Sequence, residues 1–189
     1  MTEPETTVTH WVNVARKNIS EFERSPVHDL LLTPRREAFT ELYEKDPELA
    51  LKLLRTLLYK AVRKDSPGHS ISRIEAPWGC WELSEGKGKS KPSKTDVIGG
   101  MPDYCYRVIL HIVLGLLPCE NTFVRHQCNN RLCVRPDHLL LGSAEENDQD
   151  ELQRVYTGRG AKGKQQTLEA EISMSLDESS LHHLTRRSQ

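Results

Sequence analysis

Two cysteines and two histidines fall within the polar stretch "HQCNNRLCVRPDH", residues 126–138, of a chain that has only five cysteines. A loop this polar cannot hold itself together by burying apolar side chains, so its stability must come from elsewhere. Four explanations fit the spacing: a structural metal site, a hydrolytic active site, a disulfide loop, or coincidence. Whatever the chain folds into has to accommodate this segment.

The composition of the whole chain indicates what kind of protein carries this segment. With 37% hydrophobic and 28% charged residues and a net charge of -1, the chain suits a globular protein rather than a polycation, so nucleic-acid binding would need local basic patches. No apolar run approaches the ~20 residues that span a bilayer. The N-terminus "MTEPETTVTH" lacks the pattern of a signal peptide. We therefore expect an intracellular protein with no membrane partner, where reduced thiols favour a metal over a disulfide.

The metal interpretation has a plausible ligand set. Cys128, Cys133 and His138 follow one another at intervals of five residues, and thiolate and imidazole ligands suit tetrahedral zinc. A structural zinc needs a fourth ligand, and Cys80 in "WGCWEL" is the best candidate. We expect the two remaining cysteines to be packed or incidental thiols.

The hydrolytic interpretation rests on His126 and Asn147. His126 ends a predicted strand, "TFVRH", and Asn147 lies in the first turn of a helix predicted after the second strand, "HLLLG". A strand-turn-helix would bring the Asn147 amide oxygen near the face that carries His126. Each residue alone has an ordinary structural explanation. Together, a histidine base and an oxygen ligand for a divalent cation are the minimum parts for hydrolysing a phosphodiester.

The flanking segments are mostly helical. "PRREAFTELYEKD" and "DPELALKLLRTLLYKAVRK" predict a helical hairpin, with Asp46 as N-cap and Pro47 at the first position of the second helix. "YCYRVILHIVLG" predicts a buried helix that ends near Gly115. "SAEENDQDELQRVY" predicts a helix with Ser143 and Glu146 as a capping box.

A lysine-rich segment, "SEGKGKSKPSKTD", predicts a loop between two of these elements. It carries Lys87, Lys89, Lys91 and Lys94. The simplest interpretation is a solvated flexible loop. Beside a nuclease-like site, the same lysines become candidates for contacting DNA phosphates.

The five residues His126, Cys128, Cys133, His138 and Asn147 fit a known pattern. "HQCNNRLCVRPDHLLLGSAEEN" resembles the His-Cys box of homing endonucleases and the related phage-type HNH endonucleases, both of the ββα-metal nuclease superfamily. Upstream, "GCW" is similar to the segment that gives the remote zinc cysteine, and "YCYRVILHIVLG" to the helix that carries an arginine facing the active site. Tyr106 is a departure, because phage-type relatives often have a histidine immediately before that arginine.

The resemblance implies a division of roles. His126 would be the general base, Asn147 would hold a single catalytic Mg²⁺, and Arg107 would contact the scissile phosphate. The structural Zn²⁺ would be held by Cys80, Cys128, Cys133 and His138.

At the level of the fold, the resemblance implies an α+β protein with a ββα-metal nuclease core and a structural zinc loop, preceded by an α-helical N-terminal segment. We expect a helical region over residues 1–70, used for DNA contact or dimerisation, a ββα-metal HNH/His-Cys box nuclease domain over 71–165, and a C-terminal tail over 166–189.

The expected function is that of a Mg²⁺-dependent, site-specific endonuclease of the homing type, acting on double-stranded DNA as a homodimer. It would work in the nucleus if it comes from a eukaryotic intron, or in the cytoplasm or nucleoid if it is phage or bacterial. The alternative is a zinc-stabilised DNA-binding regulator without catalysis. A third interpretation is a zinc-stabilised interaction protein whose helical hairpin binds a protein partner.

Overall fold

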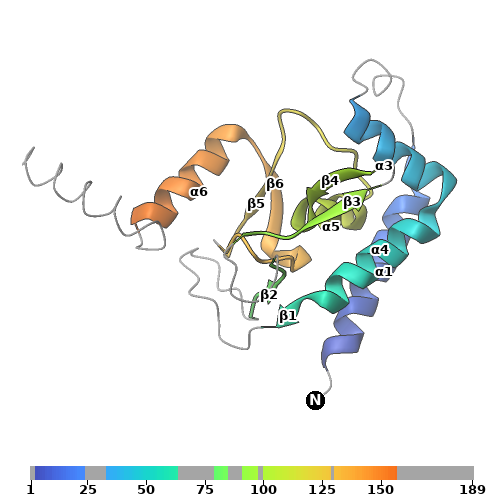
Figure 1. Ribbon diagram of the computed structural model, residues 1–189, viewed down its shortest axis with the longest axis horizontal. Helices are drawn as coiled ribbons and strands as arrows, with labels where there is room; N and C mark the ends of the chain where they lie inside the picture. Colours follow the sequence, from blue (N-terminus) through green and yellow to red (C-terminus); the bar gives the residue numbers. More distant parts are fainter. Residues whose placement is uncertain are drawn as a thin grey trace, which may run out of the picture. The chain divides into compact units, whose positions relative to one another are not determined.

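The computed structural model describes residues 3–23, 33–63, 79–84, 91–97, 100–128 and 130–156. These residues belong to two units, residues 1–144 and 145–189, and each unit is described by itself. In its described residues, the first unit holds four α-helices and three strand pairs (Figure 1). The described part of the second unit is helical.

Four α-helices make up most of the described part of the first unit (Figure 1). They are α1 (Glu3–Ser20), α3 (Pro34–Lys45), α4 (Pro47–Lys60) and α5 (Cys105–Leu114). The predicted hairpin is confirmed as α3 and α4, and the Asp46 side chain accepts a hydrogen bond from the backbone N–H of Leu49 at 3.0 Å. Pro47 stands at the start of α4, where its missing N–H costs nothing.

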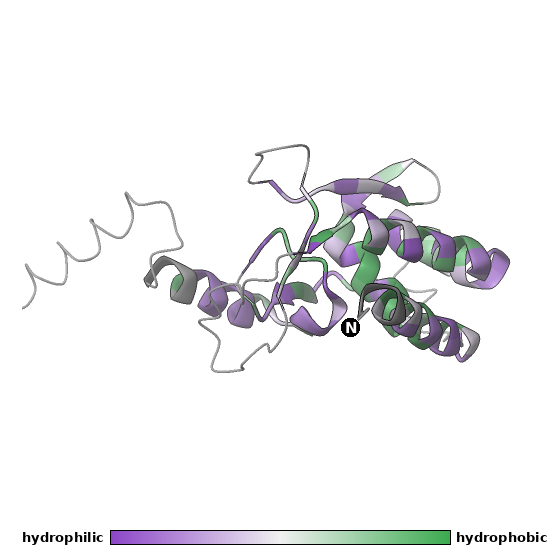
Figure 2. Ribbon diagram, turned by 90° about the horizontal axis from the view of Figure 1, so that it is seen from below, coloured by the Kyte–Doolittle hydropathy of each residue, from purple (hydrophilic) through white to green (hydrophobic). Residues whose placement is uncertain are grey.

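The hydrophobic core lies where α1, α4 and α5 pack against one another. Green and purple alternate along the helices in Figure 2, as expected of helices with one buried side. Fully buried side chains come from all of them, among them Val8, Val12, Leu54, Leu58, Ile109 and Ile112. The N-terminal helices therefore share a single core with α5 and do not form one of their own. No described helix is long and apolar enough to cross a membrane.

Gly115 ends α5, as the sequence predicts. Because it has no side chain, it also allows the end of α5 to lie close to α1. It adopts the left-handed conformation with φ 63° and ψ 29°, which glycine tolerates best. A Cβ atom at this position would lie 2.8 Å from the backbone carbon and oxygen of Asn18 in α1. The Asn18 side-chain amide donates a 2.7 Å hydrogen bond to the carbonyl of Val113. The close approach of α1 to the end of α5 thus depends on glycine.

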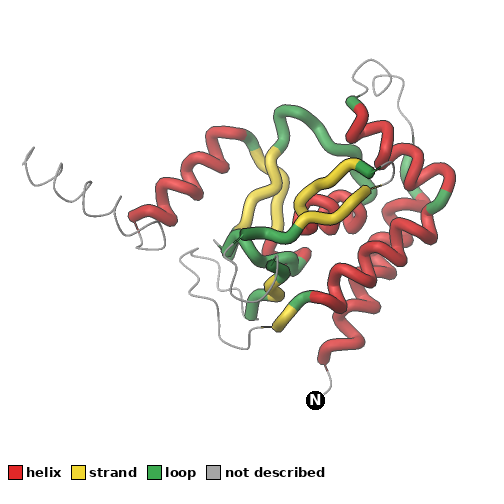
Figure 3. The backbone as a smooth tube through the Cα atoms, viewed as in Figure 1, coloured by secondary structure: helices red, strands yellow, loops and turns green. Residues whose placement is uncertain are grey.

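The strands form three separate antiparallel pairs and no larger sheet in the described residues (Figure 3). The pairs are β1 (Val62–Arg63) with β2 (Trp81–Glu82), β3 (Lys94–Val97) with β4 (Met101–Tyr104), and β5 (Phe123–His126) with β6 (Leu139–Gly142). The β3–β4 pair lies against α5. The pairing of β5 with β6 confirms the two strands predicted around the central segment.

The lysine-rich segment is only partly a loop. The prediction of a loop up to Asp96 is wrong at its end, because β3 begins at Lys94 and pairs with β4. Lysine and aspartate have low strand propensity, and here the pairing with β4 overrides that preference. Lys91 and Lys94 are exposed, whereas Lys87 and Lys89 lie outside the described residues.

A short 3₁₀-helix, η1 (Pro136–His138), leads into β6, and α6 (Ala144–Tyr156) follows β6. The order β5, β6, α6 matches the strand, strand and helix of a ββα motif. From Glu145 onward α6 belongs to the second unit. The packing of α6 on the two strands therefore stays a prediction.

Candidate functional site

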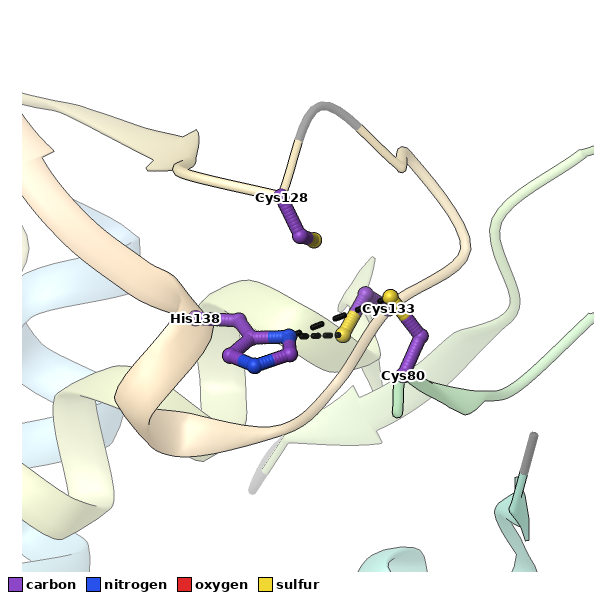
Figure 4. Close-up of side chains that lie close together, drawn as sticks. All are labelled: Cys80, Cys128, Cys133 and His138. Atoms are coloured by element: carbon purple, nitrogen blue, oxygen red, sulfur yellow. Dashed lines mark hydrogen bonds between the residues drawn. The ribbon is translucent and has the colours of Figure 1, made fainter. Parts of the chain in front are cut away.

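The structure brings the four predicted zinc ligands together. The side chains of Cys80, Cys128, Cys133 and His138 are all buried, and their ligand atoms all lie within 4.8 Å of one another (Figure 4). His138 Nδ1 lies 3.5 Å from Sγ of Cys133 and 3.8 Å from Sγ of Cys80. Zinc–sulfur bonds of about 2.3 Å and zinc–nitrogen bonds of about 2.0–2.1 Å give a tetrahedral sulfur–nitrogen edge of about 3.6 Å. The cluster has the chemistry and the size for a tetrahedral zinc ion.

Backbone pairing carries Cys80 to the other three ligands. Leu83 N–H donates to the carbonyl of Leu132 at 2.9 Å, and Val134 N–H donates to the carbonyl of Trp81 at 2.8 Å. These bonds lay the segment containing β2 alongside residues 132–134, which include Cys133. A cysteine far away in sequence thus enters the cluster through strand-like pairing.

Side chains around the loop reinforce this arrangement. The Arg135 guanidinium forms a two-pronged pair with Asp137, at 2.6 and 2.8 Å, and donates to the carbonyl of Gly79 at 3.1 Å. Asn130 donates to Glu82 at 2.9 Å and accepts from the backbone N–H of Leu132. The ligand-bearing loop is therefore tied at several points to the strand that precedes it.

The three thiols need a cation if all of them are to be thiolates. Hydrogen bonds from Cys128 and then from Cys133 lower the pKa of the Cys80 thiol far below its ordinary value. Hydrogen bonds with Cys128 and Cys80, together with burial, raise the pKa of the Cys133 thiol. One thiolate therefore forms at the expense of its neighbours, and a divalent cation among them would remove this competition.

His126 ends β5 next to the cluster. Its Nε2 atom lies 3.1 Å from the backbone carbonyl oxygen of Cys133. A carbonyl oxygen only accepts hydrogen bonds, so Nε2 carries a proton, and in the neutral form of the ring the lone pair is on Nδ1. The Tyr106 ring packs on the imidazole, with centroids 4.6 Å apart. Both the tautomer and the orientation of this half-buried histidine are thus fixed.

Arg107 lies beside the same tyrosine, in the first turn of α5. Its guanidinium carbon lies 5.8 Å from the ring centroid of Tyr106 and 5.3 Å from that of Tyr104, and the two rings stack with centroids 5.6 Å apart. Its Nη1 atom is 4.0 Å from Oδ1 of the buried Asp103. The predicted base and the predicted phosphate-binding arginine therefore contact the same aromatic side chain.

Asn147 lies in α6, within the second unit. Its predicted position beside His126 stays a prediction. Among the other predicted residues, Lys94 lies over the Tyr104 ring, with Nζ 5.0 Å from the centroid.

A cavity of about 620 Å³ lies at the far end of α5, with His111 and Gly115 in its lining. None of the predicted site residues that the structure describes lines this cavity. His126, Tyr106 and Arg107 instead lie at the N-terminal end of α5, partly exposed to solvent.

The part of the chain that carries Tyr106, Arg107 and His126 is similar to a known protein family. Residues 103–149 match the family model described as "HNH endonuclease". This stretch of the chain therefore resembles an HNH endonuclease domain. It begins at Asp103 and contains Tyr106, Arg107 and His126, together with three of the four clustered ligands.

The chain is also 36% identical over 107 residues to "Protein 2.8" of Escherichia phage T7. The aligned part covers 54% of this chain and 66% of the phage protein, and its name states no function. No solved structure matches the chain.

These findings support the predicted HNH nuclease family and a metal-binding Cys/His cluster. They do not extend to the features specific to His-Cys box homing endonucleases. Two residues next to the predicted site, Asp103 and Arg35, have no part in the sequence interpretation, and Tyr106 enters it only as a departure from the pattern. Asp103 had one available signal, because it is an acidic residue just before a predicted apolar helix.

Proposed function

We propose that this protein is a Mg²⁺-dependent endonuclease that cuts double-stranded DNA at specific sites, with His126 as general base. The observation that carries the proposal is the orientation of His126 within an HNH endonuclease domain. Its ring is held by the Cys133 carbonyl and by Tyr106, and the guanidinium carbon of Arg107 lies 5.8 Å from the centroid of the same tyrosine ring.

In this mechanism, Nδ1 of the neutral His126 ring takes a proton from water as the water oxygen attacks the phosphorus atom. The bond from phosphorus to the 3′ oxygen then breaks. General base catalysis of this kind contributes about 10²–10⁴-fold to a rate. The partly exposed Arg107 guanidinium neutralises charge on the non-bridging phosphate oxygens, where negative charge builds up.

The amide oxygen of Asn147 would be the protein ligand of the Mg²⁺ ion, since an oxygen ligand suits this hard cation. When bound, Mg²⁺ supplies charge neutralisation for the phosphate and the leaving oxygen. Cys80, Cys128, Cys133 and His138 would hold the structural zinc. Because the carbonyl of Cys133 orients His126, the zinc cluster and the base are coupled through one residue.

The biological setting is proposed on the resemblance alone. A homodimer would place one site on each DNA strand, and a homing role would require a long recognition sequence. The domain boundaries at residues 70 and 165, and a DNA contact by Lys87, Lys89, Lys91 and Lys94, belong to the same proposal. Cleavage of a randomised DNA library would reveal the length of the recognised site.

Cleavage of supercoiled plasmid in the presence of Mg²⁺ tests the proposal. Wild-type protein should linearise the plasmid, whereas His126→Ala and Asn147→Ala should lose at least about 10²-fold in rate. The matched control is His10→Ala, because His10 is an exposed histidine of α1. Undiminished cutting by His126→Ala would refute the assignment of the base. DNA binding by the wild type with no cutting would favour the non-catalytic regulator.

A further inference from the structure

Asp103 joins the nuclease domain to a helix outside it. This buried carboxylate, with a side chain that is only 8% exposed, forms an ion pair with Arg35 through Oδ2 and faces Arg107 from Oδ1. Arg35 is the second residue of α3, and 68 positions separate it from Asp103 in the sequence. The N-terminal helical region thus supplies a cationic side chain at the edge of the proposed active site.

One carboxylate cannot satisfy both guanidinium groups. Each guanidinium has five N–H donors. Oδ1 of Asp103 already accepts a 2.7 Å hydrogen bond from the backbone N–H of Tyr104, and Arg107 Nη1 lies beyond hydrogen-bond distance at 4.0 Å. Two positive charges around one negative charge leave an excess that an anion would balance.

Both guanidinium groups can reach such an anion. The side chains of Arg35 and Arg107 are 33% and 31% exposed. Arg35 is held on the protein side by its ion pair with Asp103, and the guanidinium of Arg107 lies 4.0 Å from the same carboxylate. Anchored, half-exposed arginines suit phosphate oxygens, because the fork of N–H groups matches their geometry.

The position of Arg35 is not explained by the stability of its own helix. The first turn of a helix lies at the positive end of the helix dipole, where a cation is unfavourable. Burial and the nearby Arg107 both lower the pKa of Arg35, as expected where like charges are held together. A bound anion would interact favourably with the positive end of the helix dipole and with the two neighbouring arginines.

A series of contacts leads from the base to this arginine. His126 contacts Tyr106, Tyr106 contacts Arg107, and Arg107 faces Asp103, which pairs with Arg35. We propose that Arg35 binds a DNA phosphate beside Arg107, on the phosphodiester next to the one that is cut. This inference rests on the proposed nuclease function and assigns the α3 region a part in holding the DNA.

The test is the salt dependence of binding to a duplex oligonucleotide, measured by fluorescence anisotropy without Mg²⁺ so that no cutting occurs. In Arg35→Gln the slope of log affinity against log salt should fall by about 0.9, the value for one lost phosphate contact. Arg55→Gln is the matched control, because Arg55 is an exposed arginine of the neighbouring helix α4, and its slope should equal that of the wild type.

An unchanged slope in Arg35→Gln, with a wild type that binds and cuts DNA, would overturn this inference alone. A wild type that does not bind duplex DNA would overturn the inference and the proposed function together. If Arg35→Gln does not fold, phenylglyoxal modification of wild-type protein answers the same question. Bound DNA should then protect Arg35 and leave Arg55 reactive, and equal reactivity with and without DNA would contradict the proposal.

Discussion

Gly115 offers a quantitative test of the packing that positions α5, the helix carrying Arg107. In Gly115→Ala the new methyl group would meet the backbone of Asn18 at 2.8 Å, while φ stays at +63°. The left-handed conformation costs an alanine about 1 kcal/mol, and overpacking against backbone atoms that cannot rotate away adds about 1–3 kcal/mol. Gly100→Ala is the matched control, because Gly100 has φ +75° with no described atom within 4 Å of its Cβ position.

The two variants separate backbone strain from the steric clash. Urea unfolding followed by circular dichroism should show Gly100→Ala losing about 1 kcal/mol of unfolding free energy, and Gly115→Ala losing about 1–3 kcal/mol more. DNA cleavage should fall with Gly115→Ala at temperatures where the variant begins to unfold. Equal losses in the two variants would refute the close contact between α1 and the end of α5.

Two further predictions concern the metal cluster and a buried histidine. Metal analysis should find about one zinc per chain in the wild type and in Cys119→Ser, whose cysteine is exposed, but much less in Cys80→Ser; equal zinc in both variants would contradict the ligand set. Burial, and then Arg35, lower the pKa of His111 to about 4, so the unfolded state binds the proton first and stability falls as pH drops below the ordinary value of about 6.5. Between about pH 7.5 and 5.5 this group should cost the wild type about 1.3 kcal/mol of unfolding free energy. His111→Gln should lose less over the same range, and an identical loss would show that His111 is not buried in its neutral form.

Most of the Cys/His cluster could be predicted from sequence, because three of its four members lie close together along the chain. Cys128, Cys133 and His138 lie on one short loop, and soft ligands at that spacing have few other uses in a reducing setting. The helices α3, α4 and α5 were also predictable, since each has an apolar side and recognisable ends. The sequence indicates α1 only weakly, and the burial of Val8, Val12, Ala15 and Ile19 in the structure shows which side of the helix faces the core.

The remaining parts of the site depend on contacts between distant segments. Nothing near Arg35 in the sequence indicates Asp103 as its partner, because the two residues are 68 positions apart and meet only in the folded chain. The support of His126 by the Cys133 carbonyl involves backbone atoms, which carry no sequence signal. The sequence does not indicate β3, because its mostly polar residues form a strand only through their pairing with β4.

Chemical rescue of His126→Ala tests most directly the claim that His126 is the general base. Single-turnover cleavage should fall by about 10²–10⁴-fold in the variant, with zinc content unchanged. Added imidazole should restore part of the rate, in proportion to its neutral form, because it replaces the missing base. Full activity without imidazole, or a loss of activity that imidazole leaves unchanged while DNA binding and fold are intact, would contradict the account.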